Sequence, residues 1–222
     1  MSSPTPATAP PPPRRRRTTR LTRARILEAA RRELGRNPDS SLGEIAEAAG
    51  VARRTVYTHF AGRAALVAGL AEEAAEAVRL AIAVTAPDSG PGPEAALARF
   101  VLTLWPVGDC YRTLIGLAGQ DLGPDEVREV LAPARETVAG ILAEGQRQAV
   151  FQAAVPPGPL SSAIEAHLLA LLGAVNRGIW ADDGTGAAVA ALIAAGVDRV
   201  TAAATVRRLR GTTPLPTAHR PH

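Results

Sequence analysis

The sequence predicts an all-α protein of about nine helices. The composition and the positions of proline and glycine between helical patterns both support this fold class. Of the 222 residues, 46 are alanine, the best helix former, and 46% are hydrophobic. Aromatic residues make up only 3%, and β-branched runs are scarce, which argues against a β-sandwich or barrel. The chain is long enough to bury a substantial core, as one domain or as two small ones.

The first helical pattern follows a stretch rich in proline and arginine. Residues 1–20 show no apolar periodicity, which predicts an extended, disordered arm. A helix is predicted from Thr22, because apolar residues recur at three- and four-residue steps until Gly35 ends the pattern. Ser41 is the expected N-cap of the next helix. The next three helices are predicted at 42–49, 53–60 and about 63–84.

Helical patterns continue after a break rich in proline and glycine at 87–93. Pro106 separates two of them, and Pro133 lies inside another, where it predicts a kink or a split. Residues 211–222 read as a flexible tail that contains proline. The predicted helices of this part are 94–105, 109–119, 125–149, 160–181 and 186–208.

Charge is distributed unevenly along the chain. All 25 basic residues other than histidine are arginine. Residues 1–63 hold 13 Arg and 5 acidic residues, a net charge of +8, whereas the remainder carries −4. This asymmetry indicates either a polyanion-binding N-terminal part or a basic tail that only aids solubility.

Residues 40–70 have the pattern of two short helices around a tight turn, as in a helix-turn-helix. Gly50 stands where the first helix must enter the left-handed conformation, which glycine adopts without a Cβ penalty. Polar and basic residues on the second helix have no evident burial role and suit a major groove. The residues expected to face inward are Ile45, Ala46, Ala49, Val51, Val56 and Phe60. The residues expected to face outward are Arg53, Arg54, Thr55, Tyr57, Thr58 and His59.

At these residues the sequence resembles the TetR family of bacterial transcriptional regulators. The resemblance covers about residues 20–70 and rests on four segments. They are TRARILEAA from Thr22, IAxxAGV ending at Val51, TVYxHF ending at Phe60, and Ala65-Leu66. The rest of the chain resembles the family only in length, helicity and a late helix that contains tryptophan.

The resemblance implies a homodimer whose N-terminal heads each place a recognition helix in the major groove of one half-site. By position, it implies base and nearby backbone contacts for Arg53, Arg54 and Tyr57. It implies phosphate contacts for Ser41, Thr55, His59 and Arg63. The sequence departs from the family pattern at Ala52, which caps poorly, at Arg54, where many members have a small residue, and at 36–40. These departures leave the operator sequence open.

Three of these assignments have a structural alternative. Tyr57 could instead be a partly buried aromatic that holds the head together, and His59 a packed or capping histidine. The run from Arg14 to Arg17 could be a minor-groove arm, a solvated charge run or the product of a misassigned start codon.

A second site is expected in the C-terminal body, where the resemblance implies a ligand pocket between the middle helices. Phe100, Trp105, Cys110 and Tyr111 cluster in sequence and are candidate ligand contacts, together with His167. Plain core packing is the alternative for each, and His167 could equally lie in the core or an interface. A redox role for Cys110 is disfavoured, because the neighbouring Asp109 would raise the pKa of its thiol.

The predicted organisation is therefore an arm at 1–20, a DNA-binding domain at 21–63, a ligand-binding and dimerisation domain at 64–210 and a tail at 211–222. The apolar segments 160–181 and 186–208 are expected to form a four-helix dimer interface. The candidates for core or interface are Leu168, Leu171, Leu172, Val175, Ala191, Ile193 and Val197.

Other classes of protein fit less well. With one cysteine, four histidines and no HExxH, P-loop, GxSxG or GxGxxG pattern, we expect no catalytic residues, metal site or cofactor. No apolar run is expected to reach the length of a membrane span, and no signal peptide is evident, so a cytoplasmic protein is expected. The predicted function is a ligand-responsive repressor that binds an operator. An architectural DNA-binding protein without a ligand is the alternative.

Overall fold

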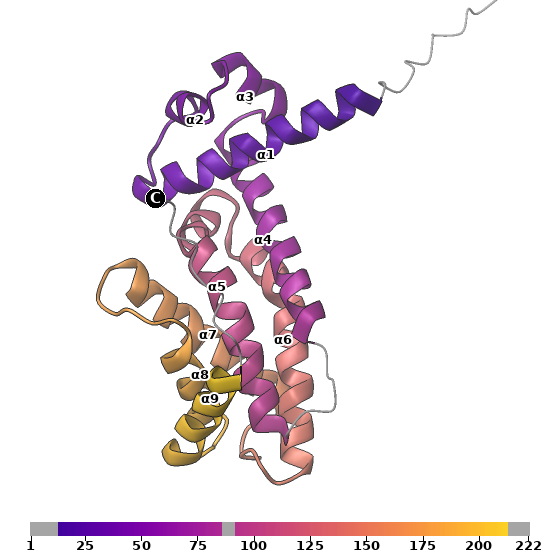
Figure 1. Cartoon of the computed structure of the whole chain (residues 1–222), viewed down its shortest axis with the longest axis vertical. Coiled ribbons are helices and arrows are strands. Elements are labelled where there is room, and N and C mark those ends of the chain that lie inside the picture. The colour runs from indigo at the N-terminus through magenta and orange to yellow at the C-terminus, as the bar shows by residue number, and fades with distance from the viewer. Residues whose placement is uncertain (1–12, 86–91, 213–222) are drawn as a thin grey trace, which may run out of the picture. The chain divides into compact units, whose positions relative to one another are not determined.

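The structure is a computed structural model that describes residues 13–85 and 92–212 (Figure 1). Within these residues the chain forms nine helices and no strand, so the predicted all-α fold is confirmed. The chain divides into two compact units, with the boundary between Leu70 and Ala71.

The N-terminal unit contains α1 (Pro13–Arg36), α2 (Leu42–Ala48), α3 (Arg53–His59) and the start of α4 (Arg63–Thr85). Helix α2 packs against both α1 and α3. The side chains of Ile26 and Leu27 on α1, Ile45 on α2 and Val56 on α3 are fully buried. Apolar burial therefore holds these short helices together, because a seven-residue helix is not stable alone.

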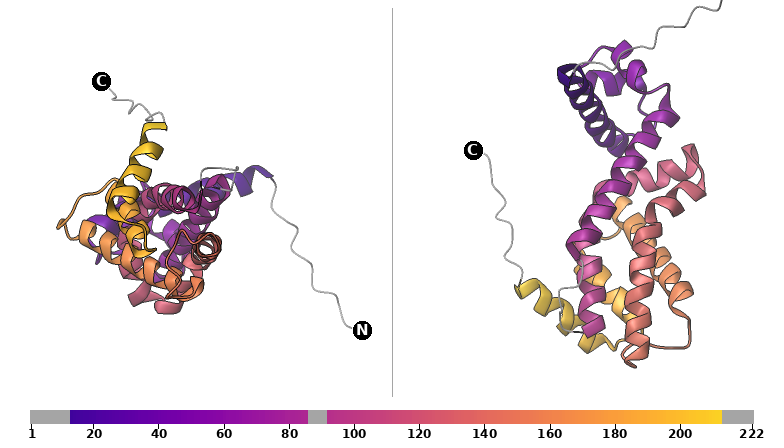
Figure 2. Two further views of the ribbon diagram at one scale, coloured as in Figure 1. Left: turned by 90° about the horizontal axis from the view of Figure 1, so that it is seen from below. Right: turned by 90° about the vertical axis from the view of Figure 1, so that its right-hand side faces the viewer.

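The C-terminal unit contains the rest of α4, α5 (Gly92–Asp121), α6 (Pro124–Arg147), α7 (Pro157–Asn176), α8 (Thr185–Ala194) and α9 (Arg199–Thr212). Helix α5 is central, since it packs against α6, α7, α8 and α9. Helix α9, yellow in Figure 2, also packs against α8. The core includes Leu97, Leu142, Ile164 and Leu192, each at most 1% exposed.

Helix α1 begins earlier than the sequence predicted. It starts at Pro13 rather than Thr22, so the expectation of an extended arm through residue 20 is wrong for residues 13–20. Proline suits the first turn of a helix, where its missing N–H would have no partner, and the arginines that follow are good helix formers. The rest of the predicted arm, residues 1–12, lies outside the described residues.

Two helix boundaries also differ from the prediction. The segments 94–105 and 109–119 form one helix, α5, which continues through Pro106. Buried residues on both sides, Trp105 and Leu114 among them, stabilise the helix against the loss of one backbone hydrogen bond. Conversely, 186–208 is divided into α8 and α9 at Gly196, whose φ is +99°.

Helix α7 corrects the expectation that no apolar segment reaches the length of a membrane span. It has 20 residues and is long and apolar enough to cross a membrane by length and composition alone. A core helix of a soluble protein passes the same test. Only 22% of its most apolar window is buried, and Leu168, Leu169, Leu171 and Val175 pack against the core in part.

The turn after α2 gives the first testable prediction. Gly50 has a φ of +62°, and a Cβ there would lie 3.3 Å from Nη2 of Arg25, which donates a 2.8 Å hydrogen bond to the carbonyl of Ala49. Gly50→Ala should therefore lower the free energy of unfolding by about 1–2 kcal/mol, measured by denaturant titration.

The matched control is Gly62→Ala. A Cβ at Gly62 meets nothing within 4 Å, and its φ is not in the left-handed range. This variant should be neutral, or stabilised by up to about 1 kcal/mol through the unfolded chain. Equal losses in the two variants would contradict the assigned role of the Gly50 turn.

Candidate nucleic-acid interface and ligand cavity

Helices α2 and α3 and the turn between them form a helix-turn-helix. Ser41 caps α2: its hydroxyl accepts a hydrogen bond from the Glu44 N–H at 3.3 Å, and its own N–H donates to the Glu44 carboxylate at 2.7 Å. Ala52 stands at the N-cap of α3 and makes no side-chain cap. Ser41 therefore caps α2 as predicted, and Ala52 does not cap α3, also as predicted.

The hydrogen bonds from Ser41 lower the pKa of the Glu44 carboxyl below its ordinary value, with the backbone N–H as the main cause. Because the pKa is lower in the folded chain, this interaction contributes to stability at neutral pH. The contribution is lost as the pH falls through the folded-state pKa.

The outward face of α3 carries the side chains expected to contact DNA. Arg53 and Arg54 are exposed, and the Tyr57 side chain is 47% exposed. The Arg53 guanidinium lies over the Tyr57 ring, 5.8 Å from its centroid. A ring that is about half exposed is compatible both with contact to DNA and with the alternative of a partly buried aromatic that holds the head together.

The other predicted contact residues are tied more closely to their own unit. Thr58 is exposed but donates its hydroxyl to the Arg54 carbonyl at 2.9 Å. Thr55 and His59 are half-buried, and the His59 ring lies 6.4 Å from that of Phe60. Arg63 donates to the carbonyls of Ser40 at 3.2 Å and Pro38 at 2.6 Å. Arg63 and Ser41 therefore have structural roles within the unit.

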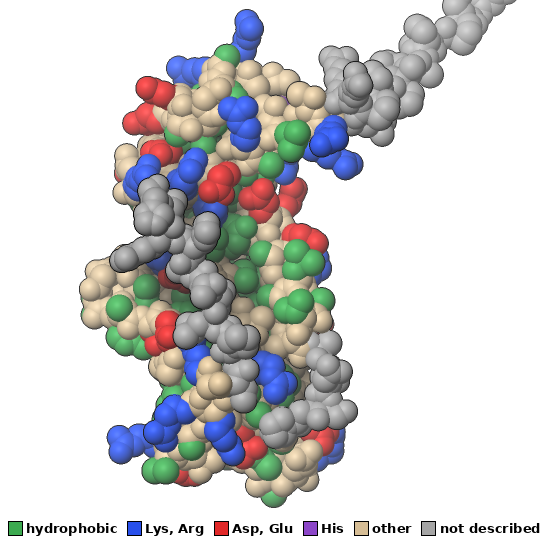
Figure 3. Space-filling model, in the orientation of Figure 1, with side chains coloured by type: hydrophobic (Ala, Val, Ile, Leu, Met, Phe, Trp, Pro, Cys, Tyr) green, Lys and Arg blue, Asp and Glu red, His purple; other side chains and the backbone are tan. Residues whose placement is uncertain are grey.

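The early part of α1 adds basic side chains to this unit. Arg17 and Arg20 are exposed, and neither forms an ion pair with any described residue. Arginine side chains, blue in Figure 3, project from the N-terminal unit at the top of the view. The first acidic residue of α1 is Glu28.

The C-terminal unit contains a partly open cavity of about 140 Å³ between α4, α5, α6 and α7. Its wall is almost entirely apolar. Of the five residues predicted as ligand contacts, Phe100, Trp105 and Tyr111 line it. The remaining wall includes Ala71, Ala74, Val78, Val101, Leu104, Ala134, Val138, Ile164, Leu168 and Leu172.

Cys110 and His167 do not line the cavity, and both are exposed. Cys110 precedes the cavity residue Tyr111, and one step along a helix rotates a side chain by about 100°. His167 likewise precedes the cavity residue Leu168 on α7. The prediction that these two residues contact a ligand is not supported by this geometry.

Sequence reasoning missed the one ion pair in the cavity wall. Arg135 on α6 donates to both carboxylate oxygens of Glu165 on α7, at 3.0 and 3.1 Å. Ser161, also in the wall, donates its hydroxyl to the Arg135 carbonyl at 2.8 Å. The three side chains therefore join α6 to α7 beside the cavity.

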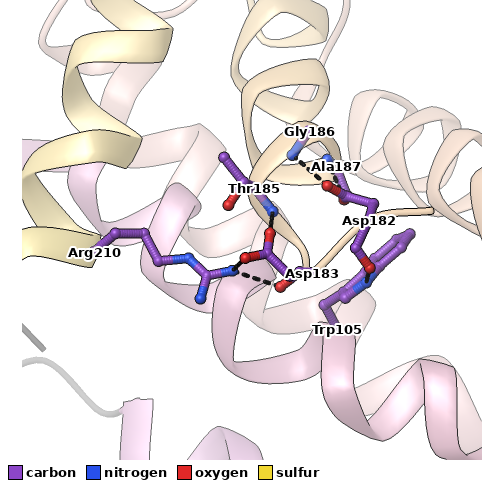
Figure 4. Close-up of polar contacts among 7 residues, drawn as sticks. All are labelled: Trp105, Asp182, Asp183, Thr185, Gly186, Ala187 and Arg210. Carbon is purple, nitrogen blue, oxygen red and sulfur yellow. Dashed lines mark hydrogen bonds and ion pairs between the residues drawn. The ribbon is translucent and has the colours of Figure 1, made fainter. Parts of the chain in front are cut away.

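Trp105 connects the cavity wall to the loop before α8 (Figure 4). Its indole N–H donates to the Asp182 carbonyl at 3.2 Å, and its ring packs edge-on against Trp180. The Asp182 carboxylate accepts the N–H groups of Gly186 and Ala187 at the start of α8.

Asp183 in the same loop is held by a second set of contacts. Arg210 on α9 pairs with its carboxylate at 2.8 Å and donates to its carbonyl at 2.6 Å. Hydrogen bonds from Thr185, chiefly from its side chain, lower the pKa of Asp183 below its ordinary value. The loop behind Trp105 is thus anchored to both α8 and α9.

Within residues 13–85 and 92–212, no group of three or more His, Cys, Asp or Glu side chains is arranged to hold a metal ion.

A two-unit helical protein with an N-terminal helix-turn-helix and a separate apolar cavity is the class that fold and sites define. Residues 26–70 match the family model described as bacterial regulatory proteins, tetR family. The HTH-type transcriptional repressor LfrR of Mycolicibacterium smegmatis is 42% identical over 80 residues. That alignment covers 36% of this chain and 42% of LfrR, less than half of its length.

Solved structures give matches over more of the chain. The TetR-like regulator LfrR from Mycobacterium smegmatis, in complex with proflavine, has a TM-score of 0.62 and 27% identity, covering 81% of this chain and 96% of that one. RolR, in complex with resorcinol, has a TM-score of 0.56 and 23% identity, and the match covers 90% of this chain and 97% of RolR. At that identity the similarity concerns the fold alone. Residues 26–70 are therefore similar to the tetR family of bacterial regulatory proteins, and the chain as a whole is similar to the solved structure of LfrR.

The contacts of Arg63 give a prediction that separates a structural role from a DNA-contact role. Arg63→Lys keeps the charge but replaces the fork of donors that reaches both Pro38 and Ser40. It should lower the free energy of unfolding by about 1 kcal/mol in denaturant titration. Arg54→Lys, at an exposed guanidinium, should change it by less than about 0.5 kcal/mol. If the Arg63→Lys variant were as stable as the unaltered protein, the structural role of Arg63 would be rejected and phosphate contact would remain as its main role.

Proposed function

We propose that this chain is a ligand-responsive transcriptional regulator, a repressor that binds a pseudo-palindromic operator as a homodimer in the cytoplasm. A small, largely apolar effector bound in the C-terminal cavity releases it from DNA. The observation that carries the proposal is the exposed basic face of α3, with Arg53, Arg54 and Tyr57, on a matched tetR-family segment. The relatives LfrR and RolR are described as a repressor and as a ligand complex.

The proposed roles of the α3 residues follow from their exposure. Arg53, Arg54 and Tyr57 read base edges and nearby backbone, because their side chains are free to enter a major groove. Thr55, Thr58 and His59 position the helix on phosphates, as do the helix start at Ser41 and the guanidinium of Arg63. None of these roles is catalytic.

The proposed dimer rests on the apolar surface of α7. Leu168, Leu171 and Val175 on α7 are only partly buried within this chain, so part of its apolar surface is left for a partner to cover. Helix α8 is less available than expected, because Ala187, Ala188 and Ala191 are fully buried. A second copy of the chain that packs on α7 would cover the exposed surface by two-fold symmetry.

The proposed response to an effector passes through α4. This helix starts in the N-terminal unit at Arg63 and continues to Ala71, Ala74 and Val78, which line the cavity. An effector changes DNA affinity only if it binds the DNA-competent and released states unequally. Couplings of about 1–3 kcal/mol, typical of such systems, correspond to a 5–150-fold change in affinity.

The experiment that tests the function is selection from a random duplex library with the purified full chain at about 150 mM salt, near the physiological value. We expect an enriched inverted repeat with half-sites about one helical turn apart or slightly more. Arg53→Ala should relax base preference within the half-site while the repeat spacing stays the same. If the protein bound DNA with a steep salt dependence but enriched no sequence, the proposed regulator would be rejected in favour of an architectural DNA-binding protein.

A second prediction concerns the exposed arginines at the start of α1. If Arg17 and Arg20 each neutralise a phosphate, the double variant Arg17→Gln/Arg20→Gln should reduce the slope of log affinity against log salt by about 1.8. The control, Arg199→Gln/Arg207→Gln, makes the same charge change at exposed positions of α9. Its slope should match that of the unaltered protein. An equal reduction in both variants would mean that only net charge matters.

A further inference from the structure

The outward face of α3 carries two guanidinium groups that no other described part of the chain engages in a hydrogen bond. Arg53 and Arg54 are both exposed, and neither side chain forms a hydrogen bond or ion pair with any residue the structure describes. Arg63, in contrast, uses its guanidinium on the carbonyls of Pro38 and Ser40. The N–H donors of Arg53 and Arg54 are therefore available to a partner.

The same helix lacks the side chains that read two of the other bases. The sequence of α3 is RRTVYTH, which contains no Asn, Gln, Asp or Glu. Asn and Gln are the usual partners of adenine in the major groove, and Asp and Glu are those of cytosine. Thr58 is exposed, but its hydroxyl already donates to the Arg54 carbonyl at 2.9 Å. Hydrogen-bond donors therefore dominate this face.

Guanine is the base whose major-groove edge suits such a face. Its O6 and N7 are both acceptors, whereas adenine presents one acceptor and one donor, cytosine a donor, and thymine one acceptor beside a methyl group. A guanidinium can donate to two neighbouring acceptors through two parallel N–H groups. Opposite adenine or cytosine the same group would set a donor against a donor and lose a hydrogen bond.

The positions of the two arginines on α3 assign them to different bases. Arg53 lies four residues before Tyr57, on the same stripe of the helix, and its guanidinium is held over the Tyr57 ring at 5.8 Å from the centroid. Arg54 lies on the neighbouring stripe with Thr58, rotated by about 100°. The two guanidinium groups carry like charges and point from different stripes, so one base cannot bind both.

We propose that each operator half-site presents two guanines to α3, one bound by Arg53 and one by Arg54, each through O6 and N7. This inference rests on the proposed function in taking α3 as the helix that reads DNA, and it adds the bases that the operator must contain. The Tyr57 ring positions the Arg53 guanidinium for its guanine.

The first experiment repeats the selection from a random duplex library with the full chain and with its Arg53→Gln and Arg54→Gln variants. The unaltered chain should enrich an inverted repeat with guanine at two fixed positions of each half-site. Because glutamine pairs with adenine, each variant should change one of these positions to adenine, and the two variants should change different positions. An enriched repeat without the two guanines, or variants that both keep them, would overturn the proposal.

The selected duplex then gives the size of the preference. Replacing one of the two guanines by adenine, with its pairing partner changed to thymine, should weaken binding by the unaltered chain about 5–150-fold. A loss of less than about twofold at both positions would contradict bidentate contacts, whose discrimination lies well above that factor. Measurements on the unaltered chain decide the proposal even where a variant does not fold.

A modified base separates contact with guanine from a preference for DNA shape. 7-Deazaguanine pairs with cytosine as guanine does but lacks the N7 acceptor. Placed at the guanine assigned to Arg54, it should weaken binding by the unaltered chain about tenfold, since a hydrogen bond to a charged group is lost. It should not weaken binding by Arg54→Ala. An equal loss in both proteins, or no loss in either, would overturn the direct contact and leave shape as the source of the preference.

Two further variants serve as controls. Arg36→Gln removes the same charge from the N-terminal unit at a side chain that is 73% exposed and pairs with Glu33, so it should keep both guanines. Tyr57→Leu removes the ring beneath Arg53 and should reduce the preference only at the guanine assigned to Arg53, whereas Tyr57→Phe should keep it. A changed base preference in Arg36→Gln would show that net charge selects the bases and would overturn the proposal.

The failure of this inference is distinguishable from failure of the proposed function. If the unaltered chain enriched no sequence, the regulator itself would be rejected. If it enriched an inverted repeat that lacks the two guanines, the regulator would remain and the assignment of Arg53 and Arg54 to guanine would be rejected.

Discussion

Alanine side chains allow the helices of the C-terminal unit to pack closely, because they bring little bulk to each crossing. Ala187, Ala188 and Ala191 are fully buried on α8, which packs against α5. The same property leaves space elsewhere, since Ala71, Ala74 and Ala134 line the cavity where longer side chains would fill it. The close packing of α5 against α8 and the open volume beside α5 thus follow from one compositional feature.

The N-terminal unit was predictable because its signals are local. The Ser41 cap, the Gly50 turn and the inward positions of Ile45 and Val56 all act within a few residues of sequence. The divisions of the C-terminal unit were less predictable. The Gly196 break lies inside a continuous apolar pattern, although Asp198, which accepts the N–H groups of Val200 and Thr201, was a usable signal for a new helix start.

The ligand site could be predicted only in part, for a physical reason. Phe100, Trp105 and Tyr111 were found because they cluster in sequence and because aromatic side chains are typical of the walls of ligand pockets. Arg135 and Glu165 were missed because they lie on different helices, and no periodicity shows that two such side chains meet. Cys110 and His167 were included because closeness in sequence was taken for closeness in space, whereas their own helices turn them outward.

The proposed response to ligand depends on how firmly each part of α4 is held. At its start, Arg63 binds the carbonyls of Pro38 and Ser40, so the helix is fixed to the loop that precedes α2. Further along, Ala74 and Val78 line the cavity, where they would contact a bound ligand. Coupling of this kind is reciprocal: DNA must weaken effector binding by the factor by which the effector weakens DNA binding. A change at Arg63 that loosens the start of α4 would then reduce both effects together, without contact with the effector.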